Sequence, residues 1–435
     1  MRRHGALLFG LFVLASLLLP GGAEPVRGQI PDVMVYEGAR LIVGDRTPAI
    51  ENSAFVVENG RFTQVGRLGQ VKVPAGAGRV DLTGRTVMPA ILDVHTHSVQ
   101  ASTTRAQLVE RLEQQAYFGV AAVLSLRDAG EIPFEVRANP PAGAALFLTG
   151  GRGIVGTEGG AARVEYLVST EDEARQAVRD HAALHVDMIK IWVDDRNGQV
   201  PALPAVAYRA IIDEADKYGL RVYAHIRYLS DAKELLRAGL HGFAHGVRDM
   251  DIDDEFVALW KERPEVFLTP NLPPRGVAPD LTWLQEAFPA EAYREILDQA
   301  ENGGDGDTLR FNRQRPLEPF AIQARNLARL NAAGVKIGLG TDSSVGWGVH
   351  VEMEDMVKAG MTPAQVLVAA TSASADILKL ADYGTVAPGK SASFIVLNAN
   401  PLDDITHTRR IVAVYLRGAA VNRTALRARW SRGAS

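Results

Sequence analysis

The feature that most constrains the fold is an alternation of apolar runs with helix-like segments through the middle of the chain. Helices expected over 171–183, 205–218 and 230–238 are amphipathic, and the first opens on a capping box, Thr170 with Glu173. Strands that alternate with helices build parallel α/β sheets, and eight such units close a (β/α)₈ barrel. We therefore predict an α/β fold with a TIM barrel over residues 86–382. The eight runs are 87–94, 119–126, 144–149, 186–193, 220–225, 241–245, 265–269 and 336–341.

The two ends of the folded part have a different pattern. Residues 32–85 and 383–425 contain short β-like runs separated by Gly, Pro and Asn, and Glu58-Asn59-Gly60-Arg61 is typical of a tight hairpin turn. Neither end is long enough to build a core alone. We expect both to combine into one small composite β-sandwich domain beside the barrel.

Residues 1–23 have the pattern of a secretory signal peptide. A basic start, Arg2 and Arg3, precedes an apolar run over 5–19, and small residues lead to Ala23. The run is short for a membrane span. We expect cleavage, export to the periplasm or the medium, and no stable membrane insertion afterwards; an uncleaved anchor is the alternative.

Composition narrows the partners and the metal donors. The chain has 435 residues and a net charge of −4 without long charged blocks, which argues against nucleic acid or an anionic membrane as the main partner. We expect a small-molecule substrate; a homo-oligomer is compatible with the sequence. The chain lacks cysteine, so a metal would need histidine or carboxylate ligands.

Polar residues end or line five of the expected barrel strands. His95 and His97 follow the first run at alternate positions and should therefore point the same way. Functional groups of such barrels lie at the carboxyl ends of the strands. Any one of these residues has an ordinary structural explanation, but the set favours a metal site. Its other members are Lys190, His225, His245 and Asp342.

Further motifs accompany these residues. They are Gly84-Arg85-Thr86-Val87-Met88-Pro89, Leu126-Arg127-Asp128-Ala129-Gly130, Ala369-Ala370-Thr371 and Gly384 through Lys390. With them, the chain over roughly 32–420 resembles the amidohydrolase superfamily, and within it the prolidase-like and imidazolonepropionase-like group. Ala90 departs from the glycine that usually follows the proline in this family.

The resemblance implies a binuclear metal centre, with zinc as the expected metal. It also implies that a hydroxide shared by the metals attacks an amide-type carbonyl, with Asp342 as general base and acid. A lysine buried beside metals is driven towards its neutral amine, which can add carbon dioxide to form a carbamate. The implied ligands are His95, His97 and Asp342 for one ion, His225 and His245 for the other, and carboxylated Lys190 as the bridge.

Substrate identity stays open at this point. Dipeptides or N-acyl amino acids are the leading hypothesis, with Tyr228 and Arg152 as candidate contacts for a substrate anion and His350 as a candidate pocket residue. One alternative is a mononuclear deaminase or an imidazolone-type cyclic amidohydrolase. A second is a lactone or ester hydrolase with the same site, and a third is a non-catalytic exported binding protein.

Overall fold

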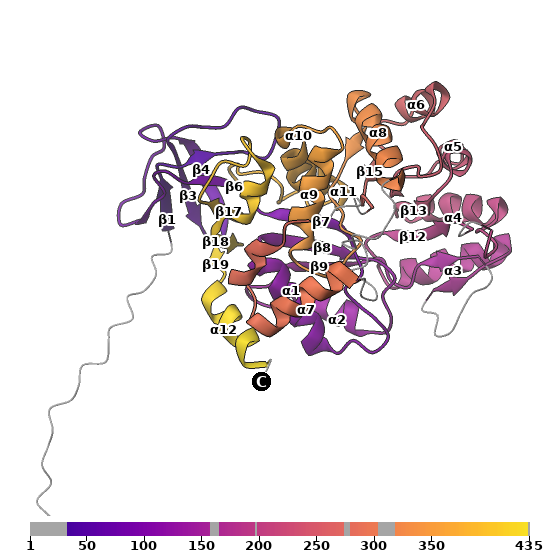
Figure 1. Cartoon of the computed structure of the whole chain (residues 1–435), viewed down its shortest axis with the longest axis horizontal. Coiled ribbons are helices and arrows are strands. Elements are labelled where there is room, and N and C mark those ends of the chain that lie inside the picture. Colours follow the sequence, from indigo (N-terminus) through magenta and orange to yellow (C-terminus); the bar gives the residue numbers. More distant parts are fainter. Residues whose placement is uncertain (1–32, 157–164, 196–197, 274–278, 303–317, 434–435) are drawn as a thin grey trace, which may run out of the picture.

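The computed structural model describes residues 33–156, 165–195, 198–273, 279–302 and 318–433. The expected signal peptide, residues 1–23, lies outside these ranges. Two groups of strands are visible: a small β region where the two chain ends meet, and a larger α/β region (Figure 1). Within the described ranges, no helix has the length and apolar character needed to cross a bilayer.

The α/β region contains two parallel sheets. Each of the eight apolar runs expected to form the barrel contributes a strand to one of these sheets, so the α/β prediction is confirmed. The three-stranded sheet has the order β7 (Ile91–Thr96), β8 (Val120–Ser125), β9 (Leu146–Thr149). The seven-stranded sheet has the order β11 (Tyr166–Leu167), β10 (Ile154–Val155), β12 (Ile189–Val193), β13 (Val222–Ile226), β14 (Gly242–Ala244), β15 (Phe267–Thr269), β16 (Lys336–Ile337).

Backbone hydrogen bonds join the two sheets at both seams. Val94 N–H donates to Leu339 O at 2.9 Å, and Asp187 N–H donates to Thr149 O at 2.9 Å. These bonds lie outside the regular strand ladders, so the described strands do not form one continuous closed sheet. Closure of a complete eight-stranded barrel stays a prediction.

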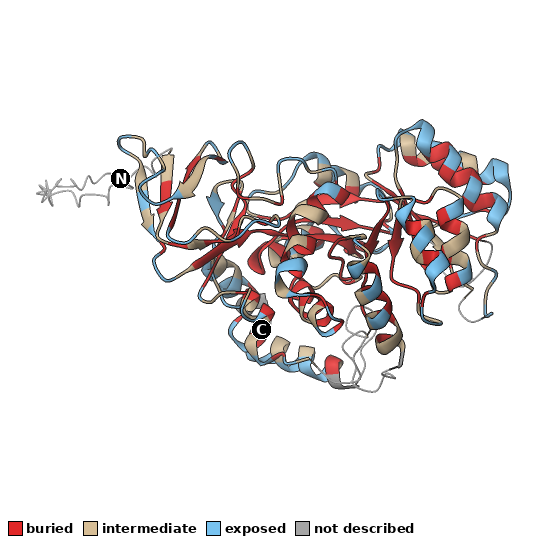
Figure 2. Ribbon diagram, turned by 90° about the horizontal axis from the view of Figure 1, so that it is seen from above, coloured by how far each residue is buried: buried red, intermediate tan, exposed pale blue. Residues whose placement is uncertain are grey.

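Helices surround the parallel strands. Their outward faces are exposed, whereas the strands between them are almost wholly buried (Figure 2). The capping box predicted at Thr170 and Glu173 is present. The helices are α1 (Arg105–Tyr117), α2 (Ile132–Ala138), α3 (Glu171–Ala183), α4 (Ala205–Lys217), α5 (Leu229–Arg237), α6 (Asp254–Lys261), α7 (Ala290–Asn302), α8 (Glu318–Ala332), α9 (Gly348–Lys358), α10 (Pro363–Val368), α11 (Ser374–Ile377) and α12 (Arg423–Gly433).

Strands from both chain ends form the small β region. Figure 1 shows the early, indigo strands beside the late, yellow ones, and β17 pairs antiparallel with β6. One sheet has the order β4 (Arg61–Arg67), β3 (Ser53–Glu58), β1 (Val33–Glu37), β5 (Gly78–Asp81). The other has the order β19 (Ala419–Ala420), β18 (Ile411–Leu416), β17 (Phe394–Leu397), β6 (Thr86–Pro89), β2 (Arg40–Leu41).

Aromatic side chains from both sheets form the core of this region. Phe55, from the first sheet, and Phe394, from the second, are fully buried with ring centroids 5.2 Å apart. The β3–β4 hairpin turns at Asn59 and Gly60, whose φ values of 50° and 74° are those of the tight turn expected there. An added Cβ at Gly60 would lie 2.6 Å from Arg417 O, so the turn also needs glycine for close approach.

The first apolar run differs from its prediction. It was expected to form one barrel strand over 87–94, but it divides at Ala90 into β6 of the small region and β7 of the α/β region. Ala90 N–H donates to Ser393 O, and the next amide, Ile91 N–H, donates to Gly119 O. Both halves are apolar and buried, so periodicity gives no sign of the division.

Candidate metal centre

Two histidines and an aspartate meet at the carboxyl ends of β7 and β16. His97 Nε2 lies 2.9 Å from Asp342 Oδ1, and His95 Nε2 lies 3.2 Å from the same oxygen. Among the described residues, these three form the one group whose ligand atoms all fall within 4.8 Å of one another. The pair expected from alternation along the first strand therefore does converge with the aspartate expected at the last.

Local backbone geometry brings Asp342 to the histidines. Asp342 N–H donates to His95 O at 2.7 Å, and the residue adopts a φ of 54°, in the left-handed region. His245 has a φ of 72°. Such conformations are costly for non-glycine residues and cluster at functional sites. Gly340 permits the close approach, because an added Cβ would lie 2.9 Å from both His95 Cβ and Asn271 Nδ2.

Hydrogen bonds fix the orientation of both imidazoles. His97 Nδ1 lies 2.6 Å from Leu126 O, and His95 Nδ1 lies 3.1 Å from Asn271 Oδ1. Both partners are acceptors, so each Nδ1 carries the proton and each neutral ring presents an Nε2 lone pair. Those lone pairs face Asp342, which is itself an acceptor. A cation between them resolves this conflict, and such support of the far ring nitrogen is usual for metal-binding histidines.

Lys190 belongs to strand β12, and its charge acts on His95 and His97. Its side chain is fully buried, and Nζ has no hydrogen-bond partner. The ring centroids of Tyr223 and Trp192 lie 4.5 and 5.4 Å from Nζ. Burial, with a smaller contribution from the charge of Arg248, lowers the pKa of Lys190 to about 7, while Asp342 opposes this shift.

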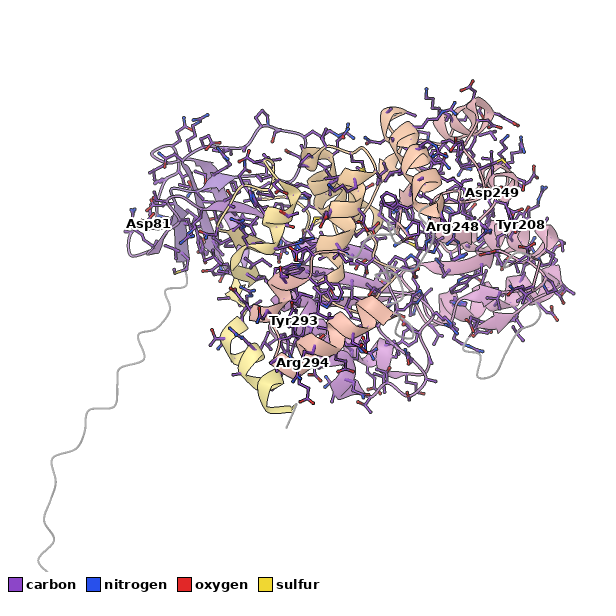
Figure 3. The ribbon with its side chains drawn as sticks, in the orientation of Figure 1. Asp81, Tyr208, Arg248, Asp249, Tyr293 and Arg294 are labelled. Carbon is purple, nitrogen blue, oxygen red and sulfur yellow. The ribbon has the colours of Figure 1, made fainter. Side chains whose placement is uncertain are left out.

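The other two histidines are adjacent but differ in their contacts. His245 Nε2 has no hydrogen-bond partner and lies 3.6 Å from Asp342 Oδ2. The His225 ring lies 4.5 Å from that of His245, but its Nε2 is 3.0 Å from Asp194 Oδ2 and 2.9 Å from Arg248 Nη2. Arg248, labelled in Figure 3, comes from the segment between β14 and α6. Nε2 of His225 is therefore already engaged.

Electrostatics keep His95, His245 and Asp342 in the form that a metal requires, whereas Asp342 favours the protonated form of His97. Burial holds the pKa of both His95 and His245 well below the usual range. Burial raises the pKa of Asp342, but the charges of the histidines and a hydrogen bond from His97 outweigh it, so the pKa lies well below its usual value. For His97, burial lowers the pKa, but interaction with Asp342 overcomes this and raises it. Metal ligands are neutral imidazoles and ionised carboxylates.

The donor set fits a metal ion. Three buried polar atoms, His95 Nε2, His245 Nε2 and Lys190 Nζ, lack hydrogen-bond partners among the described residues. Imidazole and carboxylate ligands suit zinc and related divalent ions. The arrangement provides three donors for one ion at His95, His97 and Asp342. A second ion would require a donor from His225 other than the engaged Nε2, or release of that nitrogen from Asp194 and Arg248.

The three predicted substrate contacts lie in different places. Tyr228 follows β13, and its hydroxyl donates to Asp195 Oδ1 at 2.9 Å, next to the aspartate that contacts His225. Arg152 donates to Glu165 O at 3.2 Å and lies 4.1 Å from the centroid of the Tyr166 ring. These contacts place Arg152 against the β10–β11 segment.

His350 is not brought to the metal centre by any contact in the structure. It is buried on α9, with Nε2 3.0 Å from Phe118 O and Nδ1 3.0 Å from Thr408 Oγ1. Both ring nitrogens are thus used in joining α9 to its neighbours. These contacts explain its position by packing, and the expectation that His350 lines the substrate pocket stays a prediction.

The sequence analysis missed several residues around the site. Asp194 and Asn271 follow the fourth and seventh apolar runs, so the rule that identified the histidines could also have identified them. Asp93 lies inside the first run, where its carboxylate accepts hydrogen bonds from Thr341 N–H at 3.0 Å and Thr341 Oγ1 at 2.7 Å. No sequence pattern indicates that Arg248 contacts His225.

Comparisons with known proteins identify the family of this chain. The model of the amidohydrolase family matches residues 86–421. An imidazolonepropionase from Streptomyces griseus is 26% identical over 385 residues, covering 82% of this chain and 89% of the relative.

Solved structures support the same fold. A prolidase candidate from Bifidobacterium longum has 27% identity and a TM-score of 0.75, covering 93% of this chain and all of the other. A Xaa-Pro dipeptidase solved with methionine in its active site has 20% identity and a TM-score of 0.70, covering 89% and 99% of the chains. The chain belongs to the amidohydrolase family and is a hydrolase that acts on carbon–nitrogen bonds.

Proposed function

We propose that this protein is an exported, binuclear metal-dependent hydrolase that cleaves the amide bond of dipeptides or N-acyl amino acids. The observation that carries the binuclear proposal is Lys190, a fully buried amine without a hydrogen-bond partner. Its charge acts on His95 and His97 on one side and on His225 on the other. A buried polar group normally has a partner, so an amine in this position calls for one.

The residues would share the metals as the family resemblance implies. His95, His97 and Asp342 would hold one ion, His225 and His245 would contribute to the other, and a carboxylated Lys190 would supply an anionic ligand to both. The neutral amine adds to carbon dioxide with loss of one proton, which yields an anion with two oxygen ligands. Bound divalent ions lower the pKa of water and polarise a carbonyl group.

Asp342 is the residue placed to move protons. Its Oδ1 faces His95 and His97, whereas Oδ2 faces His245. We propose that this carboxylate accepts a proton as water attacks the amide carbon and delivers it to the leaving amine. Proton transfer by a positioned side chain contributes ~10²–10⁴-fold to a rate.

Cationic side chains beside His225 support a substrate that carries a carboxylate. Arg248 contacts His225, and Arg227 O accepts the backbone N–H of Arg248 at 2.9 Å. Nε of Arg227 is buried and lacks a hydrogen-bond partner. Guanidinium groups bind carboxylates in bidentate geometry. Together with the Tyr228 hydroxyl, Arg227 and Arg248 could bind the terminal carboxylate of a dipeptide or an N-acyl amino acid.

Metal analysis combined with Lys190→Ala tests the binuclear proposal. We expect two tightly bound ions per wild-type chain and at least ~10³-fold lower kcat/KM in the variant, because the bridge is lost. Short carboxylic acids should restore part of the activity of Lys190→Ala, whereas Lys190→Arg should not be rescued. One ion per wild-type chain, or full activity in Lys190→Ala, would contradict the proposal.

A mononuclear, imidazolone-type hydrolase is the second candidate. It is favoured by the imidazolonepropionases among the relatives and by the fact that three donors for one ion already converge. A hydrolysis screen over dipeptides, N-acyl amino acids, cyclic amides, lactones and esters separates the candidates. Preferential turnover of a cyclic amide with one bound ion would favour this second candidate, and preference for lactones or esters would favour a lactone or ester hydrolase with the same site.

Export is tested by the mass of the purified protein. After expression with its own N-terminus in a secreting host, the mature chain should begin near residue 24. Retention of residues 1–23 would favour the uncleaved anchor.

A further inference from the structure

A second cavity, of about 460 Å³, is lined by none of the residues of the metal centre. It lies where α12 meets β18 and the end of α1, on the side of the α/β region near the small β region (Figure 1). Two 3₁₀ helices also contribute, η1 (Thr282–Glu286) and η4 (Ile405–Arg409). Cavities of this size accommodate small molecules.

The cavity lining is strongly cationic. Its charged residues include a single carboxylate, Glu286, whereas the chain as a whole carries a net charge of −4. The first turn of α12 also reaches the lining, which adds the positive end of a helix dipole. The cations are four arginines, Arg409, Arg410, Arg423 and Arg427.

Arg423 is a half-buried cation held by backbone oxygens. It donates to Tyr117 O at 3.0 Å and to Ile411 O at 2.8 Å, and its guanidinium lies 4.3 Å from the centroid of the Tyr117 ring. Among the described residues, no carboxylate forms an ion pair with it. Burial lowers its pKa, as expected for a cation without a compensating anion.

Arg409 contributes an unused donor. Its side chain is only 7% exposed and pairs with Glu354 through Nη2, but no described residue forms a hydrogen bond with Nε. Its guanidinium lies 5.2 Å from the centroid of the Trp283 ring. Because arginines already stand over Tyr117 and Trp283, recognition would depend on guanidinium groups rather than on stacking against these rings.

Guanidinium groups recognise the oxygens of carboxylates and phosphates. We propose that this cavity binds a small molecule with at least two negative charges, carried by carboxylate or phosphate groups. The size of the cavity and the arginines on several of its walls match such a compact polyanion. This inference is independent of the reaction proposed for the metal centre.

Calorimetric titration of the full protein with succinate and with glucose 6-phosphate, at constant low ionic strength, tests this proposal. We expect saturable binding of at least one probe and none of uncharged glucose. The preferred probe identifies carboxylate or phosphate as the recognised group. Added KCl should weaken the binding, because partly exposed charges are screened.

Variants assign the binding to this cavity. The double variant Arg410→Gln/Arg427→Gln should bind ~10-fold more weakly, whereas Glu286→Gln should bind more tightly because the lining loses its carboxylate. Arg67→Gln/Arg105→Gln, which removes two exposed charges elsewhere, is the matched control. Anion binding at the metal centre would contribute equally to all of them. Absence of saturable binding to either probe, or unchanged affinity in both Arg410→Gln/Arg427→Gln and Glu286→Gln, would overturn the proposal.

Discussion

The metal centre and the aromatic core of the small β region are both buried, but they are built on opposite principles. In the core, Phe394 packs against four other rings with centroids 4.5 to 5.8 Å apart. At the metal centre, buried nitrogens of His95, His245 and Lys190 have no hydrogen-bond partners within the described part of the chain, and Asp342 adopts a left-handed backbone conformation. The side chains of the aromatic core pack fully against one another, whereas the metal centre leaves polar nitrogens available to bind a ligand from outside the chain.

Because of this difference, we expect the aromatic core to contribute mainly to stability and the metal centre mainly to activity. Complete packing of apolar groups adds to the free energy of unfolding, while unpartnered polar atoms and backbone strain subtract from it. Substitutions at the centre should therefore affect the reaction far more than the fold. Substitutions in the aromatic core should do the reverse.

Asp342→Asn should have the largest effect. We expect kcat to fall ~10³-fold because the amide cannot accept the proton. The melting temperature of metal-free protein should not fall, since asparagine tolerates the same positive φ. Steady-state kinetics and calorimetry in the presence of a chelator measure the two quantities, with the exposed Asp251→Asn as control. A near-wild-type rate would refute the role of Asp342 as the base.

Phe394→Ala should show the opposite pattern, a large loss of stability with little change in kcat. Removing a fully buried ring should lower the free energy of unfolding by about 3–5 kcal/mol. The kcat of the folded protein should stay within about twofold, because the ring belongs to the small β region. Denaturant unfolding of Phe394→Ala and of the milder Phe394→Leu provides the measurement. A cost to stability below about 1 kcal/mol, or a large loss of kcat, would contradict the division of roles.

His350 should give an intermediate, pH-dependent effect. Burial, aided by the charge of Arg409, lowers its pKa in the folded protein from 6.5 to about 3. Below pH 6.5 the unfolded chain takes up a proton that the folded protein does not, so stability is complete above 6.5 and falls as pH drops towards 3.

The test is the slope of stability against pH for His350→Gln. Between pH 6 and 4 this slope should be flatter than in the wild type, by up to about 1.4 kcal/mol per pH unit. The same exchange at half-buried His407 is the control. An unchanged slope in His350→Gln would mean that this imidazole is not held neutral by the fold.

Tyr228→Phe should have the smallest effect, and it tests which residues around the metal centre contact the substrate. If its hydroxyl contacts the substrate carboxylate, KM should rise about fivefold to tenfold with kcat nearly unchanged. Arg152→Gln should leave both constants unchanged, because Arg152 rests against Tyr166. Equal effects of the two substitutions on KM would show that the substrate extends to the β10–β11 segment.

Much of the fold could be predicted from local pattern. Each expected barrel run contains a strand, and Thr170 with Glu173 marks the start of α3 at the predicted residue, because capping and periodicity are local properties. The division at Ala90 could not be predicted, since it depends on Ser393, about 300 residues later in the chain.

The candidate site was predictable in part for a related reason. His95, His97 and Asp342 end parallel strands, so topology alone brings them to one edge. The engagement of His225 by Arg248 and the contacts of His350 with Phe118 and Thr408 depend on side-chain orientation and long-range packing. Such contacts leave no periodic trace in the sequence.

The division at Ala90 has a consequence for the order in which the chain can fold. No linker separates β6 from β7, and β6 gains its antiparallel neighbour only when β17 is available. During synthesis, the first strand of the α/β region therefore emerges while its adjoining segment can pair on one side alone, with β2. Closing so long a loop is slow, which delays completion of this junction until the last tenth of the chain has emerged. A ribosome-bound chain that ends before residue 394 should remain susceptible to proteolysis at this junction.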